Sequence, residues 1–477
     1  MREGMMHDDS IQLFPMEEGS QSLPPAPERS EEETDEGKSP QYKLPKDKDQ
    51  PAVIRELMHN APAAFKVPTF FAAVTCLSCV ATRIRVYYLY DGQNEHALLL
   101  QTLIEGEQSS GKSFARNNVE KVIMAHLKRR DDEQRRQEQA YRELKQTASK
   151  TEKLPDPPKT MVICCPVSIS IAQLIKRADS PVRLFGTPLT LWTFTEELAT
   201  ATETNRRAFS NIKSIMRTAY DLGAEYGVDY LSDASYSATV DILYNTMFCT
   251  TPSALDEYMD RKAIEGGNIT RTIVYDLGSQ LGDEAPVFKR LTPRQQRIID
   301  RTIERMMADT YSPEGGIQPE KWIDMSWLDE EVRQWCATKN LEAVKTGSTA
   351  LGVFFKRSSV SAFRIAALCQ YLYGIEQAHG VRKKVRQIYL AMAEQVLRGM
   401  LDKWGKRFEE LQAKRIELST PVRRDLFGNL PAAFSRELLR ETIKRLELVT
   451  PDWVFLSKWN ARGLIQRISK NQFQKIG

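Results

Sequence analysis

The octapeptide Gly106-Glu107-Gln108-Ser109-Ser110-Gly111-Lys112-Ser113 has the spacing G-x-x-x-x-G-K-[ST] of a phosphate-binding loop. Gly106 and Gly111 permit backbone turns that a Cβ would forbid, so successive N–H groups can converge on an anion. Lys112 would bring a positive charge to the β- and γ-phosphates, and the Ser113 hydroxyl would ligate Mg²⁺. We therefore predict that residues 106–113 bind Mg-ATP. The alternative is a Gly/Ser-rich turn that binds nothing.

A pair of glutamates follows the apolar run Leu189 to Phe194. A P-loop hydrolase needs one acidic group near the hydrated Mg²⁺ and commonly a second that orients or deprotonates the attacking water. We predict that Glu196 contacts Mg²⁺ and that Glu197 is the catalytic carboxylate. An ordinary acidic helix start is the alternative interpretation.

Two further polar positions could complete such a site. Thr251 follows the apolar run Ile242 to Cys249 and could bond the γ-phosphate or the water, although a plain turn before Pro252 would look the same. Arg271 follows a glycine turn and could act as a finger on transition-state charge, in its own or a neighbouring subunit. The alternative is a surface arginine that caps a strand.

The strands and helices expected around these residues are those that a phosphate-binding loop needs. The apolar run Ala97 to Ile104 predicts a buried strand that delivers the loop, and a helix is expected from about Lys112. Further strands and helices then alternate, as in an α/β fold. The expected elements are strands at 161–165, 189–194, 242–249 and 272–275, a helix at 168–176, and a charged helical insertion at about 128–158.

In this order of elements, residues 51–477 resemble a largely uncharacterised family of P-loop ATPases found on bacterial plasmids, prophages and conjugative elements. The resemblance implies a RecA-like core related to replicative helicases, acting on DNA of a mobile element, often beside primase modules. That family commonly has Asp-Glu where this chain has Glu196-Glu197. No primase signature precedes the loop, so a primase partner would be a separate chain.

The flanking regions have different compositions. Residues 1–50 hold thirteen acidic and six basic residues and few large apolar ones, which predicts a disordered acidic tail. A helical lead-in is expected at 51–83, within a P-loop NTPase core at 51–285. An α-helical domain is expected at 286–420. Within it, Arg357 and Arg364 are assigned to a solvated helix face, with contact to a substrate or neighbour as the alternative.

The last stretch, 421–477, holds eleven basic and five acidic residues. Three short helices, at about 425–427, 431–439 and 451–460, and a possible hairpin at 463–475 are typical of a winged-helix-like module. Its basic side chains would approach a phosphate backbone, although such modules also dock proteins. The four predicted contacts are Arg462, Arg467, Lys470 and Lys475.

The composition of the chain indicates which kind of partner and which compartment it suits. The net charge of +4, with an acidic tail, leaves an excess of positive charge in residues 51–477, which favours an anionic partner. The apolar stretch Val67 to Ala81 is expected to be a core helix, since it is too short and too polar to cross a membrane. Seven cysteines in mostly apolar runs suit a reducing cytoplasm, and the lone Cys76-x-x-Cys79 is not expected to bind zinc.

Taken together, we expect a cytoplasmic, DNA-associated ATPase, either a helicase-like motor or a loader. If Arg271 acts on a neighbour's site, a ring-like homo-oligomer is required. The alternatives are an ATP-dependent regulatory or defence switch and a nucleotide-binding adaptor without helicase activity. A phosphotransferase is disfavoured because no substrate-lid pattern is present.

Overall fold

A computed structural model describes residues 44–475 with internal gaps. The residues outside this description are 1–43, 149–152, 199–212, 230–235, 261–262, 265, 279–283, 420–425, 428, 447, 449–450, 462–464 and 476–477. Most of the predicted acidic tail is therefore outside it. Its last residues are not: Asp47–Asp49 form a 3₁₀ turn, and Lys66 pairs with Asp47 at 2.6 Å.

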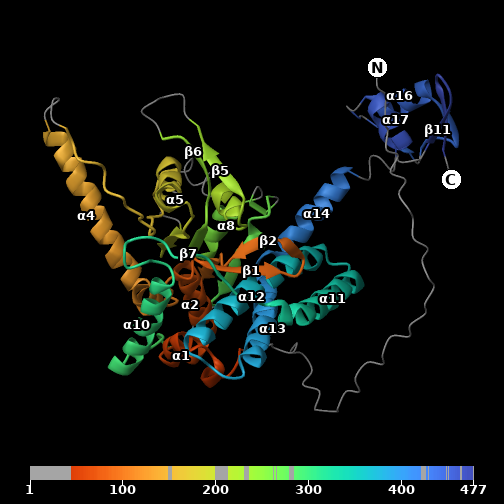
Figure 1. Cartoon of the computed structure of the whole chain (residues 1–477). Helices are drawn as coiled ribbons and strands as arrows, with labels where there is room; N and C mark the ends of the chain where they lie inside the picture. The colour runs from red at the N-terminus through yellow and green to blue at the C-terminus, as the bar shows by residue number, and fades with distance from the viewer. Residues whose placement is uncertain are drawn as a thin grey trace, which may run out of the picture. The chain divides into compact units, whose positions relative to one another are not determined.

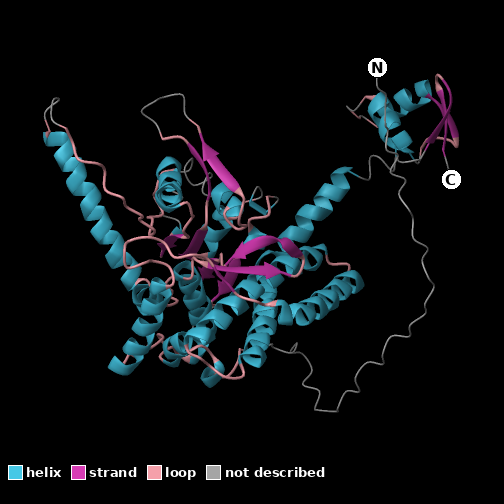
Figure 2. Ribbon diagram, viewed as in Figure 1, coloured by secondary structure: helices cyan, strands magenta, loops and turns pink. Residues whose placement is uncertain are grey.

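The protein has a mixed α/β fold built on a parallel sheet (Figures 1 and 2). Its strands lie in the order β4-β7-β3-β8 and all run in the same direction. Every residue of β3 and β7 is buried, as expected for central strands of a parallel sheet. The four strands are β3 (Gln101–Glu105), β4 (Leu191–Thr195), β7 (Tyr244–Thr250) and β8 (Ile273–Asp276).

The strand predicted at Met161 to Cys165 is reduced to a single parallel bridge between Cys164 and Trp192. The segment still lies beside β4, because the Cys165 amide donates to the Trp192 carbonyl at 2.8 Å. Asp131 of α4 (Ala125–Thr147) takes the amides of Ile163 and Cys164, at 2.9 and 2.5 Å. These amides point to a helix side chain rather than to a further strand, so no longer ladder forms.

Helices from both ends of the chain enclose the sheet. The lead-in helix α2 (Lys66–Val80) packs against β3 and β7 and is buried along most of its length. By length and mean hydropathy, Ala63–Val80 could cross a membrane, contrary to our expectation, but 78% of it is buried inside the protein. It is a core helix, as predicted. The remaining lead-in helix is α1 (Ala52–His59).

The helical region after residue 286 shares its core with the sheet. One continuous cluster of buried apolar residues extends from Val53 to Phe408, so these helices complete the α/β body rather than form a core of their own. α13 packs directly on β8, and a Cβ at Gly399 would overlap the Val274 carbonyl oxygen. The helices are α10 (Pro293–Ala308), α11 (Asp329–Thr346), α12 (Thr349–Ile375), α13 (Val381–Met400) and α14 (Lys406–Ser419).

Smaller elements decorate this body. β1 (Ile84–Tyr88) pairs with β2 (Asp91–Ala97) and with the short β9 (Lys321–Trp322). β5 (Glu225–Val228) and β6 (Ala238–Asp241) form a hairpin beside α5 (Ile171–Phe185). The charged insertion is α4, whose outer half is exposed and projects from the body in Figure 1.

The C-terminal region has a core of its own, centred on Phe434, Trp459 and Phe473. Its hairpin of β11 (Ile465–Ser469) and β12 (Gln472–Lys475) confirms the predicted pairing. The helix expected at 431–439 begins only at Arg436. Residues Ala433–Ser435 instead form β10 against β12, which buries Phe434 beside Phe473. The helices are α16 (Arg436–Arg445) and α17 (Asp452–Ala461).

Candidate functional site

The Gly106–Ser113 loop leaves the carboxyl end of β3, at the centre of the sheet. Ser109 and Gly111 adopt positive φ angles of 63° and 80°. A Cβ at Gly111 would also lie 2.7 Å from the Pro286 ring, so both conformation and space require glycine there. The helical turn that follows starts when the Phe114 and Ala115 amides bond the carbonyls of Gly111 and Lys112, at 3.0 and 3.1 Å.

The turn at residues 111–113 presents backbone N–H groups as hydrogen-bond donors. Within the described part of the chain, the backbone amides of Gly111, Lys112 and Ser113 donate no hydrogen bond. The next residues, Ala115–Glu120, form a π-helical turn, a feature that often occurs at functional sites. Unbonded amides at the start of a helix are suited to an anion.

Lys112 folds back on its own loop. Its Nζ donates to the Gly106 carbonyl at 2.6 Å and also to the Glu107 carbonyl. Partial burial lowers the pKa of Lys112, while nearby Glu107 and Glu197 act in the opposite direction. The ammonium group therefore rests on neutral carbonyls, which an incoming anion could replace as its partner.

Glu196 and Glu197 follow the end of β4, as predicted. The Thr195 hydroxyl accepts from the Glu197 amide at 3.3 Å, which forms a tight turn after the strand. Glu196 Oε2 lies 2.5 Å from Nη1 of Arg116. Arg116 is three positions after Ser113 in the sequence. The Glu196 carboxylate is thus tied to the first turn after the loop, and Glu197 faces solvent.

Thr251 enters the site from β7, the strand between β3 and β4. The Gly106 amide donates to the Thr250 carbonyl at 3.1 Å, which fixes the start of the loop against the end of β7. Thr251 then precedes α8 (Pro252–Tyr258), and its hydroxyl lies 3.4 Å from that of Ser253.

These pieces enclose one cavity of about 680 Å³. That volume is in the range of small-molecule sites. Gly106 and Glu107 do not line it, but their carbonyls hold Lys112. The lining residues are Gln108, Ser109, Ser110, Gly111, Lys112, Ser113, Glu196, Glu197, Leu198, Thr250, Thr251 and Ala254.

Arg271 is separated from this cavity. β3 and β8 are parallel and in register, with Thr102 opposite Ile273 and Glu105 opposite Asp276. The loop follows the carboxyl end of β3, whereas Arg271 precedes the amino end of β8. The two are therefore at least about 10 Å apart along the strands. The predicted role of Arg271 within its own subunit has no support in this geometry.

An ion pair that the sequence analysis missed lies beneath the loop. Glu105, the last residue of β3, is 1% exposed and pairs with Lys403. Burial raises the pKa of Glu105, and the bond from Lys403 opposes that rise. Lys403 belongs to a second π-helical turn, Leu401–Gly405, which connects α13 to α14. A charged residue closing an apolar strand was a visible signal for Glu105; nothing in the sequence indicated a partner 298 residues away.

The helical region also supports the loop through aromatic packing. Phe114 and Phe288 stack with ring centroids 5.7 Å apart, and Phe65 meets both rings edge-on at 5.3 Å. The loop is therefore held by residues from the lead-in and from the segment before α10.

No family model matches the chain, and no curated protein matches its sequence.

Proposed function

We propose that the protein binds Mg-ATP in the 680 Å³ cavity and hydrolyses it. The observation that carries this proposal is the meeting of the Gly106–Ser113 loop, the Glu196–Glu197 pair and Thr251 at the carboxyl ends of three neighbouring parallel strands. Ligands of open α/β sheets bind at this end of the strands. In a RecA-like P-loop core, this arrangement places phosphate, metal and water side by side.

The polar groups of the cavity suit both the phosphates and the Mg²⁺ of the proposed ligand. The free amides of residues 111–113 and Lys112 would hold the phosphates. Ser113 and Glu196 offer oxygen atoms, the donors that Mg²⁺ prefers, and the phosphates would supply the rest. Arg116 pairs with Glu196 at 2.5 Å. The ion would compete with Arg116 for that carboxylate and supply charge stabilisation to the phosphates.

Glu197 is the candidate for the water-activating group. It lines the cavity, lies close enough to Lys112 to influence its pKa, and is exposed. A carboxylate in this position could accept a proton from a water held in the cavity. Thr251 would contact the γ-phosphate or the water from the neighbouring strand.

We further propose that hydrolysis is coupled to DNA, as a helicase-like motor or loader in the replication or maintenance of a bacterial mobile element. The C-terminal module supports this with exposed basic groups: Arg467 and Lys470 lie at the turn of its hairpin. Lys475 is partly buried, since it donates to the Leu430 carbonyl at 2.5 Å, and Arg462 lies outside the described residues. The β10-β12-β11 sheet with α16 and α17 is the arrangement expected of a winged helix.

The test is steady-state ATP hydrolysis by wild-type and Glu197→Gln protein, with and without single-stranded DNA, at two salt concentrations. We expect DNA to stimulate turnover, and high salt to reduce the stimulation because phosphate contacts release counterions. Glu197→Gln should lower kcat about 10²- to 10⁴-fold, the usual range for a general base. Glu257→Gln, an exposed glutamate on α8 outside the cavity lining, is the matched control.

Other outcomes would redirect the proposal. Turnover that ignores DNA would favour a regulatory or defence switch driven by a protein partner. Tight ATP binding with little turnover, unchanged by Glu197→Gln, would favour an adaptor. Duplex unwinding by Lys112→Ala protein would contradict an ATP-driven motor.

A further inference from the structure

A second cavity, of about 660 Å³, lies at the opposite end of the sheet. His96 of its lining bonds Arg364 of α12, which in turn donates through Nη1 to the carbonyl of Leu99, two residues before β3. The proposed ATP site uses none of these residues. The walls come from the β1–β2 hairpin, α11, α12 and the turn at Asp221. The lining residues are Tyr88, Tyr90, Asp91, His96, Asp221, Arg333, Cys336, Ala337, Asn340, Phe355, Lys356, Arg357 and Val360.

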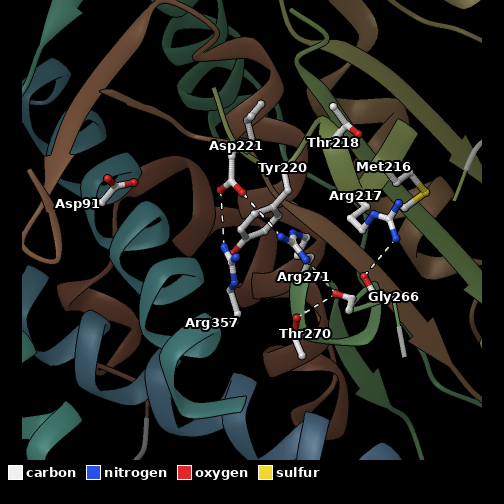
Figure 3. A network of polar contacts seen from close by, with 12 residues as sticks. Asp91, Met216, Arg217, Thr218, Tyr220, Asp221, Gly266, Thr270, Arg271 and Arg357 are labelled. Carbon is white, nitrogen blue, oxygen red and sulfur yellow. Dashed lines mark hydrogen bonds and ion pairs between the residues drawn. The ribbon is translucent and has the colours of Figure 1, made fainter. Parts of the chain in front are cut away.

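Three arginines share the carboxylate of Asp221, and Figure 3 shows two of them, Arg271 and Arg357, beside it. The Asp221 oxygens lie 3.4 Å from Arg364, 3.7 Å from Arg357 and 3.9 Å from Arg271. All three guanidinium groups also lie over the ring of Tyr220, at 4.2, 5.5 and 5.9 Å from its centroid. Among the described residues, Asp221 is the carboxylate that these three positive charges share, and it forms no close bidentate pair with any of them.

The cluster is under-satisfied. Arg364 is 1% exposed, and its Nε has no hydrogen-bond partner among the described residues; the same is true of Arg271 Nε. Burying a cation is costly unless its charge and its donors are matched. His96 accepts a bond from Arg364 at 3.2 Å but adds no compensating charge. The prediction of a solvated face for Arg364 was wrong, because α12 turns this residue into the core.

The cavity combines this positive charge with aromatic surface. Tyr90 exposes 58% of its surface, and Tyr88 lies beneath it with ring centroids 5.9 Å apart. Arg333, Lys356 and Arg357 bring three cations to the lining, and Asp91 and Asp221 bring two carboxylates. Asp91 is engaged by His96 at 3.2 Å and by Asn94 at 2.6 Å.

We propose that the second cavity binds a nucleoside phosphate, with its phosphate at Arg357 and Lys356 and its base against Tyr90. Arginine recognises phosphate through a fork of donors, and exposed aromatic rings stack on bases. Arg357 lies 3.7 Å from Asp221, which is too long for a close ion pair. A phosphate in the cavity could therefore take this guanidinium group as its partner. The ligand is either a free mononucleotide or one nucleotide of a single strand. This site is additional to the proposed ATP site.

The test is isothermal titration calorimetry on Lys112→Ala protein, in which the loop site is disabled. The titrants are adenosine monophosphate, a short oligothymidylate and inorganic phosphate. Each is compared with the double variants Lys112→Ala/Arg357→Gln and Lys112→Ala/Tyr90→Ala. The matched control is Lys112→Ala/Arg386→Gln, because Arg386 pairs with Glu331 on a helix surface outside the cavity lining.

We expect binding of the monophosphate or the strand that weakens at least about tenfold in both cavity variants and is unchanged in the control, as for the loss of a stacked base or a phosphate contact. Binding of the monophosphate alone would identify a free nucleotide as the ligand, and binding of the strand alone a nucleic acid. Absence of binding by both would overturn the proposal. So would binding that both cavity variants retain, or inorganic phosphate binding as tightly as the nucleotides.

Discussion

At the scale of single residues, Asp131 shows how burial and hydrogen bonding oppose each other. Its carboxylate is 1% exposed and accepts the amides of Ile163 and Cys164. Those bonds favour the charged form, but burial outweighs them and raises the pKa of Asp131 from 3.8 to about 6. The folded protein therefore holds this proton over a range of pH in which the unfolded chain has released it.

The expected consequence is a pH-dependent free energy of unfolding. The stabilisation linked to this proton is complete below about pH 4 and is lost as the pH rises through about 6, since the folded state binds more protons in that window. The stability of wild type should therefore fall relative to that of Asp131→Asn as the pH rises from 4 to 7. Denaturant titrations across this range would measure it, with Asp132→Asn, an exposed neighbour, as the control. Parallel pH profiles for wild type and Asp131→Asn would contradict the assignment.

At the scale of elements, the contact between α13 and β8 joins the helical region to the sheet. Gly399 permits it, because a Cβ there would overlap the Val274 carbonyl oxygen. A backbone atom inside a parallel sheet cannot move aside cheaply, in contrast to the end of a side chain. The same helix continues into the π-helical turn that carries Lys403 to Glu105, so this contact also positions a group beneath the loop.

We expect Gly399→Ala to destabilise the protein by about 1–3 kcal/mol, the usual cost of forcing extra volume into a packed core. Gly374→Ala is the matched control, since this glycine also lies in a helix, α12, and has nothing within 4 Å of an added Cβ. It should be neutral or stabilising by up to about 1 kcal/mol, because alanine is the better helix former. Thermal and denaturant unfolding would compare the two. Equal stability of the two variants would show that α13 shifts freely on β8.

At the scale of the whole molecule, Arg271 bears on assembly. It lies at the end of the sheet opposite the loop, so it could reach a γ-phosphate only on another subunit. A head-to-tail ring would bring these two ends together at each interface. Its contact with Asp221 at 3.9 Å is long enough to be exchanged for another anion.

Mixing two inactive variants would test this arrangement. Lys112→Ala lacks a working loop and Arg271→Ala lacks the finger, so each alone should hydrolyse ATP poorly. In a ring mixed one to one, an intact loop meets an intact finger at about a quarter of the interfaces, and activity should return toward that level. Failure of the mixture to exceed its components, while the proteins still co-assemble, would exclude a role in trans. An active Arg271→Ala protein would assign Arg271 to the Asp221 cluster alone.

Much of the fold was readable in the sequence because it depends on local order. Runs of apolar residues marked β3, β4, β7 and β8. The Gly106–Ser113 loop was expected directly after a strand, and it follows β3, because this order also depends on neighbouring residues. The predictions failed where a distant partner decided the outcome. The amides of Ile163 and Cys164 bond Asp131 rather than another strand, and β10 replaced the start of a helix because Phe434 packs on Phe473.

The sequence by itself determined which residues we propose for a phosphate site, since residue type and spacing within a few positions make up the loop motif and the acidic pair. The tertiary structure decided which distant groups share a site. It placed Thr251 between the loop and the glutamates through strand order, and it moved Arg271 to the opposite end of the sheet. It also buried Arg364 beside Asp221, and Lys403 beside Glu105. These pairings depend on how strands and helices pack across hundreds of residues, and no local pattern in the chain carries that information.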